Sequence, residues 1–259
     1  MEGLKVSSES EITLMSEGVP LRASGDTAGW RPVTRSLTYQ LVVEAVEAQI
    51  LSGALKVGDH LPPERELATL LRASRPAVRE GMRMLEAQGV LRTIGAGPGS
   101  ATVVTALPSE ALTRLLRLHL ALSSFRTSDV VEARVMLERR SAELAALHAA
   151  PPELNRIRVV LDRMDDLSLS MEEFNELDTE FHVSVADAGD NQLVADMTRA
   201  IRGAVRDSLL QAFRELDDWP ATAARLRAEH RAVYDAVVSG DPALAANTLE
   251  RHIRGFWSG

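Results

Sequence analysis

The sequence contains no cysteine among its 259 residues. A disulfide framework and a metal site built from thiolates are both excluded, and the absence suits a reducing compartment. The first 30 residues lack the basic and apolar regions of a secretion signal. No apolar run approaches the roughly 18 residues that span a bilayer. From these absences we expect a cytoplasmic protein that does not enter a membrane.

Acidic side chains outnumber basic ones over the whole chain, but the balance between them differs from region to region. The net charge is −8, yet residues 31–105 hold nine basic and seven acidic side chains, whereas the residues after them hold 18 and 25. An acidic remainder does not prevent a locally positive segment from approaching phosphates. The length, with 45% hydrophobic and 25% charged residues, suits two ordinary globular domains.

Turn and periodicity signals predict a small domain at residues 34–105. Apolar residues recur at helical spacing at its start, Pro62 and Pro63 suit the beginning of a second helix, and Ser74 is a good N-cap for a third. Two β-branched runs then flank a glycine-rich turn, which predicts a hairpin. The expected elements are helices at 37–52, 64–71 and 75–88 and strands at 90–94 and 101–105. This order predicts a winged helix-turn-helix.

Outside the small domain, the chain is predicted to be helical after residue 110 and without regular structure at its N-terminus. Residues 1–33 are rich in Ser, Glu and Gly without a sustained apolar period, and we expect a mobile arm. After a linker at 106–110, proline and glycine breaks divide residues 111–259 into about seven helices, with no strand-like alternation. The fold class is therefore mainly α, a winged helix-turn-helix followed by an all-α bundle.

The first domain carries the motifs of a known family. Residues 50–68 read ILSGALKVGDHLPPERELA, residues 74–81 read SRPAVREG and residues 85–89 read LEAQG. In this order they closely resemble the DNA-binding domain of the GntR family. The resemblance implies a transcriptional regulator, by default a repressor, that binds operator DNA as a homodimer.

Three residues match positions that contact DNA in that family, namely Arg65, Arg75 and Arg79. The expected positions of these residues also suit contact with DNA. Arg75 and Arg79 lie one turn apart at the start of the helix that would enter the major groove, where arginine reaches guanine edges or phosphates. Arg65 lies on the helix that crosses the DNA backbone, and Ser74 could both cap a helix and contact a phosphate.

The domain departs from the family pattern at two places. Pro63 stands where many relatives have a serine cap, and residues 95–100, at the tip of the wing, carry no basic side chain. We therefore expect base specificity to depend more on the third helix, with a weaker salt dependence of binding.

A second set of residues in the helical part suggests a metal site. Asp178 and His182 are four residues apart, so both project from one face of a helix, and His230 and His252 follow after 48 and 22 residues. One carboxylate and three imidazoles suit a borderline divalent ion such as zinc, nickel or manganese. Four protein ligands can close a tetrahedral site or leave open positions in an octahedral one.

The helical part resembles the ligand-binding domain, of FCD type, found in the FadR subgroup of the GntR family. The spacing of its Asp and three His residues matches the metal-binding members. The resemblance implies that a small carboxylate effector completes the metal shell. Arg134 matches a position whose guanidinium faces this pocket and could clamp the carboxylate. Asn191 matches a turn residue that we expect mainly to cap a helix, with ligand contact as its second role.

Two other functions stay open on the sequence. One is a metal-dependent hydrolase with an accessory DNA-binding head, which requires an unliganded general base near the metal. Glu180 is the nearest candidate, but it is two residues from Asp178 and points from another helix face. The other is a regulator whose metal is purely structural. Family members fused to aminotransferase-like domains are excluded, because they need a Schiff-base lysine and no lysine follows Lys56.

Overall fold

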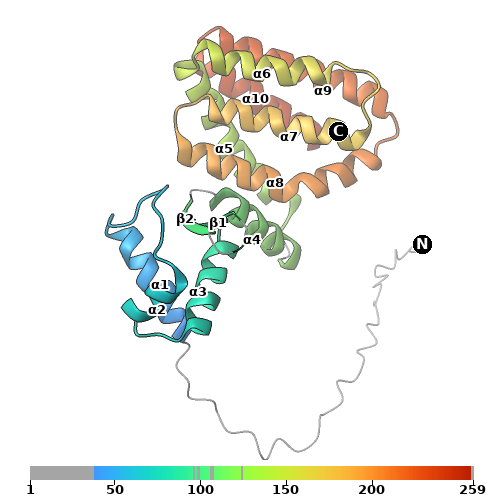
Figure 1. Ribbon diagram of the computed structural model, residues 1–259. Helices are drawn as coiled ribbons and strands as arrows, with labels where there is room; N and C mark the ends of the chain where they lie inside the picture. Colours follow the sequence, from blue (N-terminus) through green and yellow to red (C-terminus); the bar gives the residue numbers. More distant parts are fainter. Residues whose placement is uncertain (1–37, 96, 98–99, 106–107, 124, 258–259) are drawn as a thin grey trace, which may run out of the picture. The chain divides into compact units, whose positions relative to one another are not determined.

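A computed structural model describes residues 38–95, 97, 100–105, 108–123 and 125–257, so the arm expected at 1–33 lies outside the described residues. The described chain forms ten helices and one two-stranded sheet (Figure 1). None of these helices combines the length and the apolarity needed to cross a membrane. The elements are α1 (Thr38–Leu51), α2 (Glu64–Leu70), α3 (Arg75–Ala87), β1 (Leu91–Ile94), β2 (Ala101–Val104), α4 (Pro108–Leu122), α5 (Thr127–His148), α6 (Pro151–Met164), α7 (Met171–Asp187), α8 (Gln192–Arg214), α9 (Trp219–Val238) and α10 (Pro242–Trp257).

Helices α1 to α3 and strands β1 and β2 form the winged helix-turn-helix that the sequence predicts. The strands pair antiparallel, with Leu91 opposite Val104. Ser74 caps α3 as expected, because its Oγ accepts a hydrogen bond from the Ala77 N–H at 3.3 Å. Pro63 precedes α2 without a side-chain cap. The core of this head consists of Val42, Val46, Leu61, Leu67, Ala68, Val78, Met82, Leu85, Leu91 and Val104.

A glycine allows a close contact between two helices of the head. A Cβ added at Gly81 on α3 would lie 2.9 Å from Cγ1 of Val42 and 3.0 Å from the carbonyl oxygen of Tyr39, both on α1. Without a side chain at this position, α1 and α3 pack with their backbones close together. The contact holds α3, the helix expected to enter DNA, firmly on the core.

Helices α4 to α10 form the all-α part, with the seven helices that the sequence predicts. Helix α4 begins at Pro108, within the residues assigned to a linker, so helical structure resumes earlier than expected. Helix α7 begins with a capping box. The Ser170 Oγ accepts from the Glu173 N–H at 3.2 Å, and Glu173 Oε2 accepts from the Ser170 N–H at 2.8 Å.

Helix α5 is central, since it packs against α7, α8, α9 and α10 (Figure 1). Its core-facing side carries apolar residues such as Val131 and Ala142 at helical spacing. The same side also buries Arg134 and Glu138. Charged side chains in this position need partners from the neighbouring helices, because water does not reach them.

Candidate metal centre and DNA-binding face

Three helices bury polar side chains on otherwise apolar faces. Asp178 and His182 lie on the face of α7 that also carries Phe174, while His230 lies on α9 and His252 on α10. Each helix turns this face to the common core, so the four polar side chains meet there. Their exposed fractions run from 0% for His230 to 6% for His252, so bulk water is excluded from the cluster.

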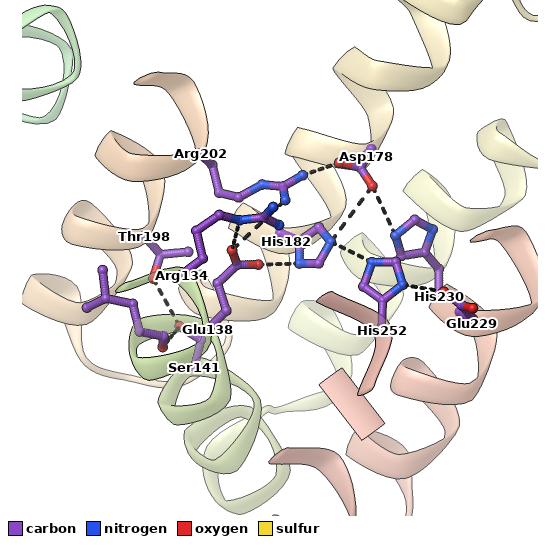
Figure 2. A network of polar contacts seen from close by, with 11 residues as sticks. Arg134, Glu138, Ser141, Asp178, His182, Thr198, Arg202, Glu229, His230 and His252 are labelled. Atoms are coloured by element: carbon purple, nitrogen blue, oxygen red, sulfur yellow. Dashed lines mark hydrogen bonds and ion pairs between the residues drawn. The ribbon is translucent and has the colours of Figure 1, made fainter. Parts of the chain in front are cut away.

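The structure brings the four predicted ligands together (Figure 2). Their donor atoms all lie within 4.8 Å of one another. Asp178 Oδ1 is 3.1 Å from His230 Nε2 and 3.8 Å from His182 Nε2. His182 Nε2 is 3.3 Å from His252 Nε2. Three imidazole nitrogens and one carboxylate oxygen therefore face one another.

Two further carboxylates orient the histidine rings. Glu138 Oε2 lies 2.6 Å from His182 Nδ1, and Glu229 Oε2 lies 2.8 Å from His252 Nδ1. Glu229 hydrogen-bonds His252 Nδ1, and Glu138 lies at ion-pair distance from His182 Nδ1, so both carboxylates favour a proton on Nδ1 and leave Nε2 facing the cluster. His230 Nδ1 has no hydrogen-bond partner among the described residues.

Two buried arginines balance two buried carboxylates beside the histidines (Figure 2). Arg134 Nε donates to Glu138 Oε1 at 2.8 Å, and Arg202 Nη2 donates to Asp178 Oδ2. This pairing makes the burial of four charges tolerable, since an unpaired charge is costly away from water. Nε and Nη1 of Arg202 lack hydrogen-bond acceptors among the described residues, so donors remain for a further anionic group.

Burial and neighbouring charges set the protonation of the cluster. Burial, with repulsion from Arg202, lowers the pKa of His182 to about 3. Burial, with repulsion from His252, lowers the pKa of His230 to about 4. Burial alone would raise the pKa of Asp178, but Arg202 and the hydrogen bond from His230 outweigh it and hold that pKa well below its usual range. Neutral imidazoles and an ionised carboxylate are the forms that bind metal ions.

The donor set fits a divalent metal ion. Asp178 Oδ1 and Nε2 of His182, His230 and His252 are the atoms that could hold it. Such an ion would supply a Lewis-acidic centre for an anionic oxygen. The orientation of the rings by Glu138 and Glu229 is the arrangement usually found behind metal-binding histidines.

A cavity of about 20 Å³ lies beside the cluster. We call it the inner cavity. Its polar wall consists of Arg134, Asp178, Arg202 and His252, and its apolar wall includes Phe213. The volume is about that of one bound water molecule. Arg134 therefore reaches the pocket as expected, but it does so while bonded to Glu138.

Two residues considered from the sequence lie away from the cluster. Asn191 is exposed, and its Oδ1 caps α8 by accepting from the Val194 N–H at 3.1 Å. It does not line the inner cavity, so the structure supports the capping role and gives no basis for ligand contact. Glu180 points outward to an ion pair with Arg163 at 2.9 Å, which leaves it unable to act as a base at the cluster.

Sequence reasoning missed three charged residues of the site: Glu138, Arg202 and Glu229. A signal for Glu138 was available, because it follows Arg134 by four residues and so shares its helix face. Arg202 could have been noticed as a lone charge on the apolar face of α8. Glu229 has no local signal, since its partner lies on the next helix.

The predicted DNA contacts are exposed on the head. Arg65 lies on α2, and Ser74, Arg75 and Arg79 lie at the start of α3. Arg79 is ion-paired, because its Nη2 donates to Glu64 Oε2 at 2.8 Å and its Nε reaches the same carboxylate at 3.2 Å. The two side chains are 57% and 41% exposed, so solvent weakens the pair and a phosphate could replace the carboxylate.

Comparison with known proteins extends these observations. Residues 38–104 match the family described as "Bacterial regulatory proteins, gntR family", and residues 129–255 match the FCD domain. The HTH-type transcriptional regulator YcbG of Bacillus subtilis is 30% identical over 226 residues, which cover 86% of this chain and 89% of the relative. The Glc operon transcriptional activator of Escherichia coli K12 is 29% identical over 221 residues, which cover 83% and 85%.

A solved structure shares the fold. The Streptococcus agalactiae GntR aligns with a TM-score of 0.59 at 22% identity, over 85% of this chain and 100% of the other. The matched families and relatives are transcriptional regulators, which sets the hydrolase alternative aside. The chain belongs to the GntR family and is a DNA-binding transcriptional regulator with an effector-binding FCD domain.

Proposed function

We propose that this regulator binds a small carboxylate at a zinc, nickel or manganese ion in its FCD domain, and that binding changes its affinity for operator DNA. One observation carries the proposal. Three imidazole Nε2 atoms and a carboxylate oxygen converge beside a cavity that Arg134 and Arg202 also line. An ionised carboxylate entering there would meet both a metal ion and a guanidinium.

The charge balance of the site favours an anionic effector. Arg134 and Arg202 are matched by Glu138 and Asp178, so the four side chains contribute no net charge. A divalent ion would add two positive charges in a region from which water is excluded. A ligand with one or two negative charges would restore the balance, whereas a neutral or cationic ligand would not.

For the head, we propose that Arg75 and Arg79 contact base edges or phosphates in the major groove. Arg65 would contact the DNA backbone, and Ser74 would add a phosphate contact while capping α3. The exposure of all four side chains supports this assignment. A homodimer would place its two copies of α3 in successive major grooves of a pseudo-palindromic operator.

The direction of regulation follows from which state the effector stabilises. We propose a repressor whose effector favours a state with weaker DNA binding. The Glc operon relative is named an activator, so the experiment has to detect a change of either sign. A reporter gene behind the operator distinguishes repression from activation.

The test combines zinc-loaded full-length protein, an operator selected by that protein from random DNA, and a panel of small carboxylates. We expect at least one acid to change operator affinity about fivefold or more. The change should disappear after chelation and in His182→Ala, but persist in His148→Ala, which alters an exposed histidine outside the cluster. If chelation lowers the melting temperature while no acid affects DNA binding, the metal is structural and the proposal fails.

A further inference from the structure

A second, larger cavity adjoins the candidate metal centre. It has a volume of about 330 Å³ and lies among α4, α5, α8 and the end of α10. We call it the outer cavity. Arg134 lines both cavities and is only 4% exposed, so the two cavities share this buried side chain as part of their walls. The two cavities are therefore adjacent at Arg134.

The volumes of the two cavities indicate which part of a ligand each one could hold. The inner cavity, at about 20 Å³, is too small for more than a water or part of a carboxylate. The outer cavity falls within the usual range for small-molecule sites, which begins near 300 Å³. An apolar cavity of roughly 150 Å³ already accommodates benzene. The outer cavity thus has room for an aryl or branched alkyl group.

The lining of the outer cavity specifies the chemistry of that group. Seven of its twelve described lining residues are apolar, Leu120, Val205 and Trp257 among them, and Thr127, Ser208 and Gln211 add uncharged polar groups. Among the described lining residues, Glu215 is the one charged side chain besides Arg134. A second carboxylate on the ligand would meet no cation other than Arg134 among these described residues and would be repelled by Glu215. The lining therefore suits an uncharged, largely apolar substituent.

We propose that the outer cavity binds the apolar substituent of the effector, and that the effector is a monocarboxylate with an aryl or branched alkyl group. This inference rests on the proposed function, because the carboxylate is held at the metal centre and at Arg134. It adds a binding site and excludes dicarboxylates and unsubstituted two-carbon acids as the preferred ligands. The apolar group adds to the affinity by leaving water for the outer cavity.

The outer cavity also touches the connection to the head. Leu120 on α4 and Phe125, which follows that helix, form part of its wall. Helix α4 begins at Pro108, and β2 of the head ends at Val104, so little chain separates them. A substituent that fills the outer cavity therefore contacts the helix that continues directly from the DNA-binding domain. The substituent should influence DNA affinity more than the carboxylate alone.

The test compares glycolate with mandelate, which is glycolate carrying a phenyl group, by calorimetry on the zinc-loaded full-length protein. We expect one mandelate enantiomer to bind at least about tenfold more tightly than glycolate. Ala212→Trp and Ser208→Trp each fill the outer cavity from α8 and should remove this advantage. Leu193→Trp, on an exposed part of α8 outside both cavities, should retain it.

The outcomes separate this inference from the function on which it rests. If glycolate binds and mandelate binds no more tightly, the outer cavity does not hold a substituent and only this inference fails. The same holds if the advantage persists in both Ala212→Trp and Ser208→Trp. If no carboxylate binds the zinc-loaded protein, the proposed function fails and this inference fails with it.

Discussion

The head and the FCD domain keep their functional side chains in opposite environments. Arg75 and Arg79 are exposed around an apolar core, whereas Arg134 and Arg202 are 4% and 1% exposed within one. An exposed arginine can be replaced without disturbing the core, so its loss should affect binding alone. A buried arginine supports the fold and the site together, so its loss should affect both.

The largest expected effect comes from Arg202→Leu in the metal-free protein. The substitution leaves Asp178 buried without its counter-charge, which costs about 3–5 kcal/mol of stability. Urea unfolding at neutral pH measures the loss, and added zinc should restore part of it by supplying a cation. The control is Arg163→Leu, which breaks an exposed ion pair worth roughly 0–1 kcal/mol. Equal losses in the two variants would contradict the contrast between buried and exposed pairs.

Acid should destabilise the FCD domain of the metal-free protein next most strongly. Burial lowers the pKa of His182 to about 3 and that of His230 to about 4, so only the unfolded chain takes up these two protons near pH 5.5. Above the unfolded value near 6.5 both histidines are neutral in the folded and the unfolded chain and do not affect stability, and stability falls as the pH drops below that value. From pH 8 to 5.5 the two histidines together should cost about 3 kcal/mol.

Chemical denaturation across this pH range provides the measurement. The double variant His182→Asn/His230→Asn removes both groups and should flatten the pH dependence between 8 and 5.5. The head has no equivalent buried histidine pair among its described residues, so a head fragment that folds alone should show a flatter profile. An unchanged slope in the double variant would show that other groups cause the loss.

Arg75→Ala should have a smaller effect that appears only in DNA binding. Its side chain is exposed, so stability should change by no more than about 0.5 kcal/mol. Loss of a base or phosphate contact should weaken operator binding about 10- to 100-fold. Fluorescence anisotropy with the selected operator measures this change. Arg140→Ala, which removes an exposed positive charge from α5, should bind DNA like the parent protein.

The same contrast explains how much the sequence could predict. The winged helix-turn-helix and the seven later helices follow from local signals, such as the Ser74 cap and the apolar periodicity. Asp178 and His182 could be identified as a pair from the sequence, because a single helix fixes their spacing. The partners of Arg202 and Glu229 could not be identified in this way, because those contacts depend on how far each helix rotates about its axis. Glu229 even precedes His230 in the chain but pairs with His252.

The smallest expected effect concerns the ion pair between Glu64 and Arg79. Both side chains are largely exposed, so Glu64→Gln should leave the fold intact. The hydrogen bond from Arg79 lowers the pKa of Glu64, so the carboxylate is ionised at neutral pH and competes with DNA for the guanidinium. Removal of this carboxylate should therefore tighten operator binding roughly 2- to 5-fold, as measured by fluorescence anisotropy at a fixed salt concentration.

A double-mutant cycle identifies the cause of this gain. If Glu64 acts by occupying Arg79, Glu64→Gln should give no gain in an Arg79→Ala background, where there is no guanidinium to release. If it acts only as a negative charge near the DNA, the gain should be the same in both backgrounds. The first result would mean that even in the exposed head one carboxylate tunes an arginine, as Glu138 does for Arg134 in the buried site. The second would limit such pairing to the FCD domain and make the contrast between the two regions complete.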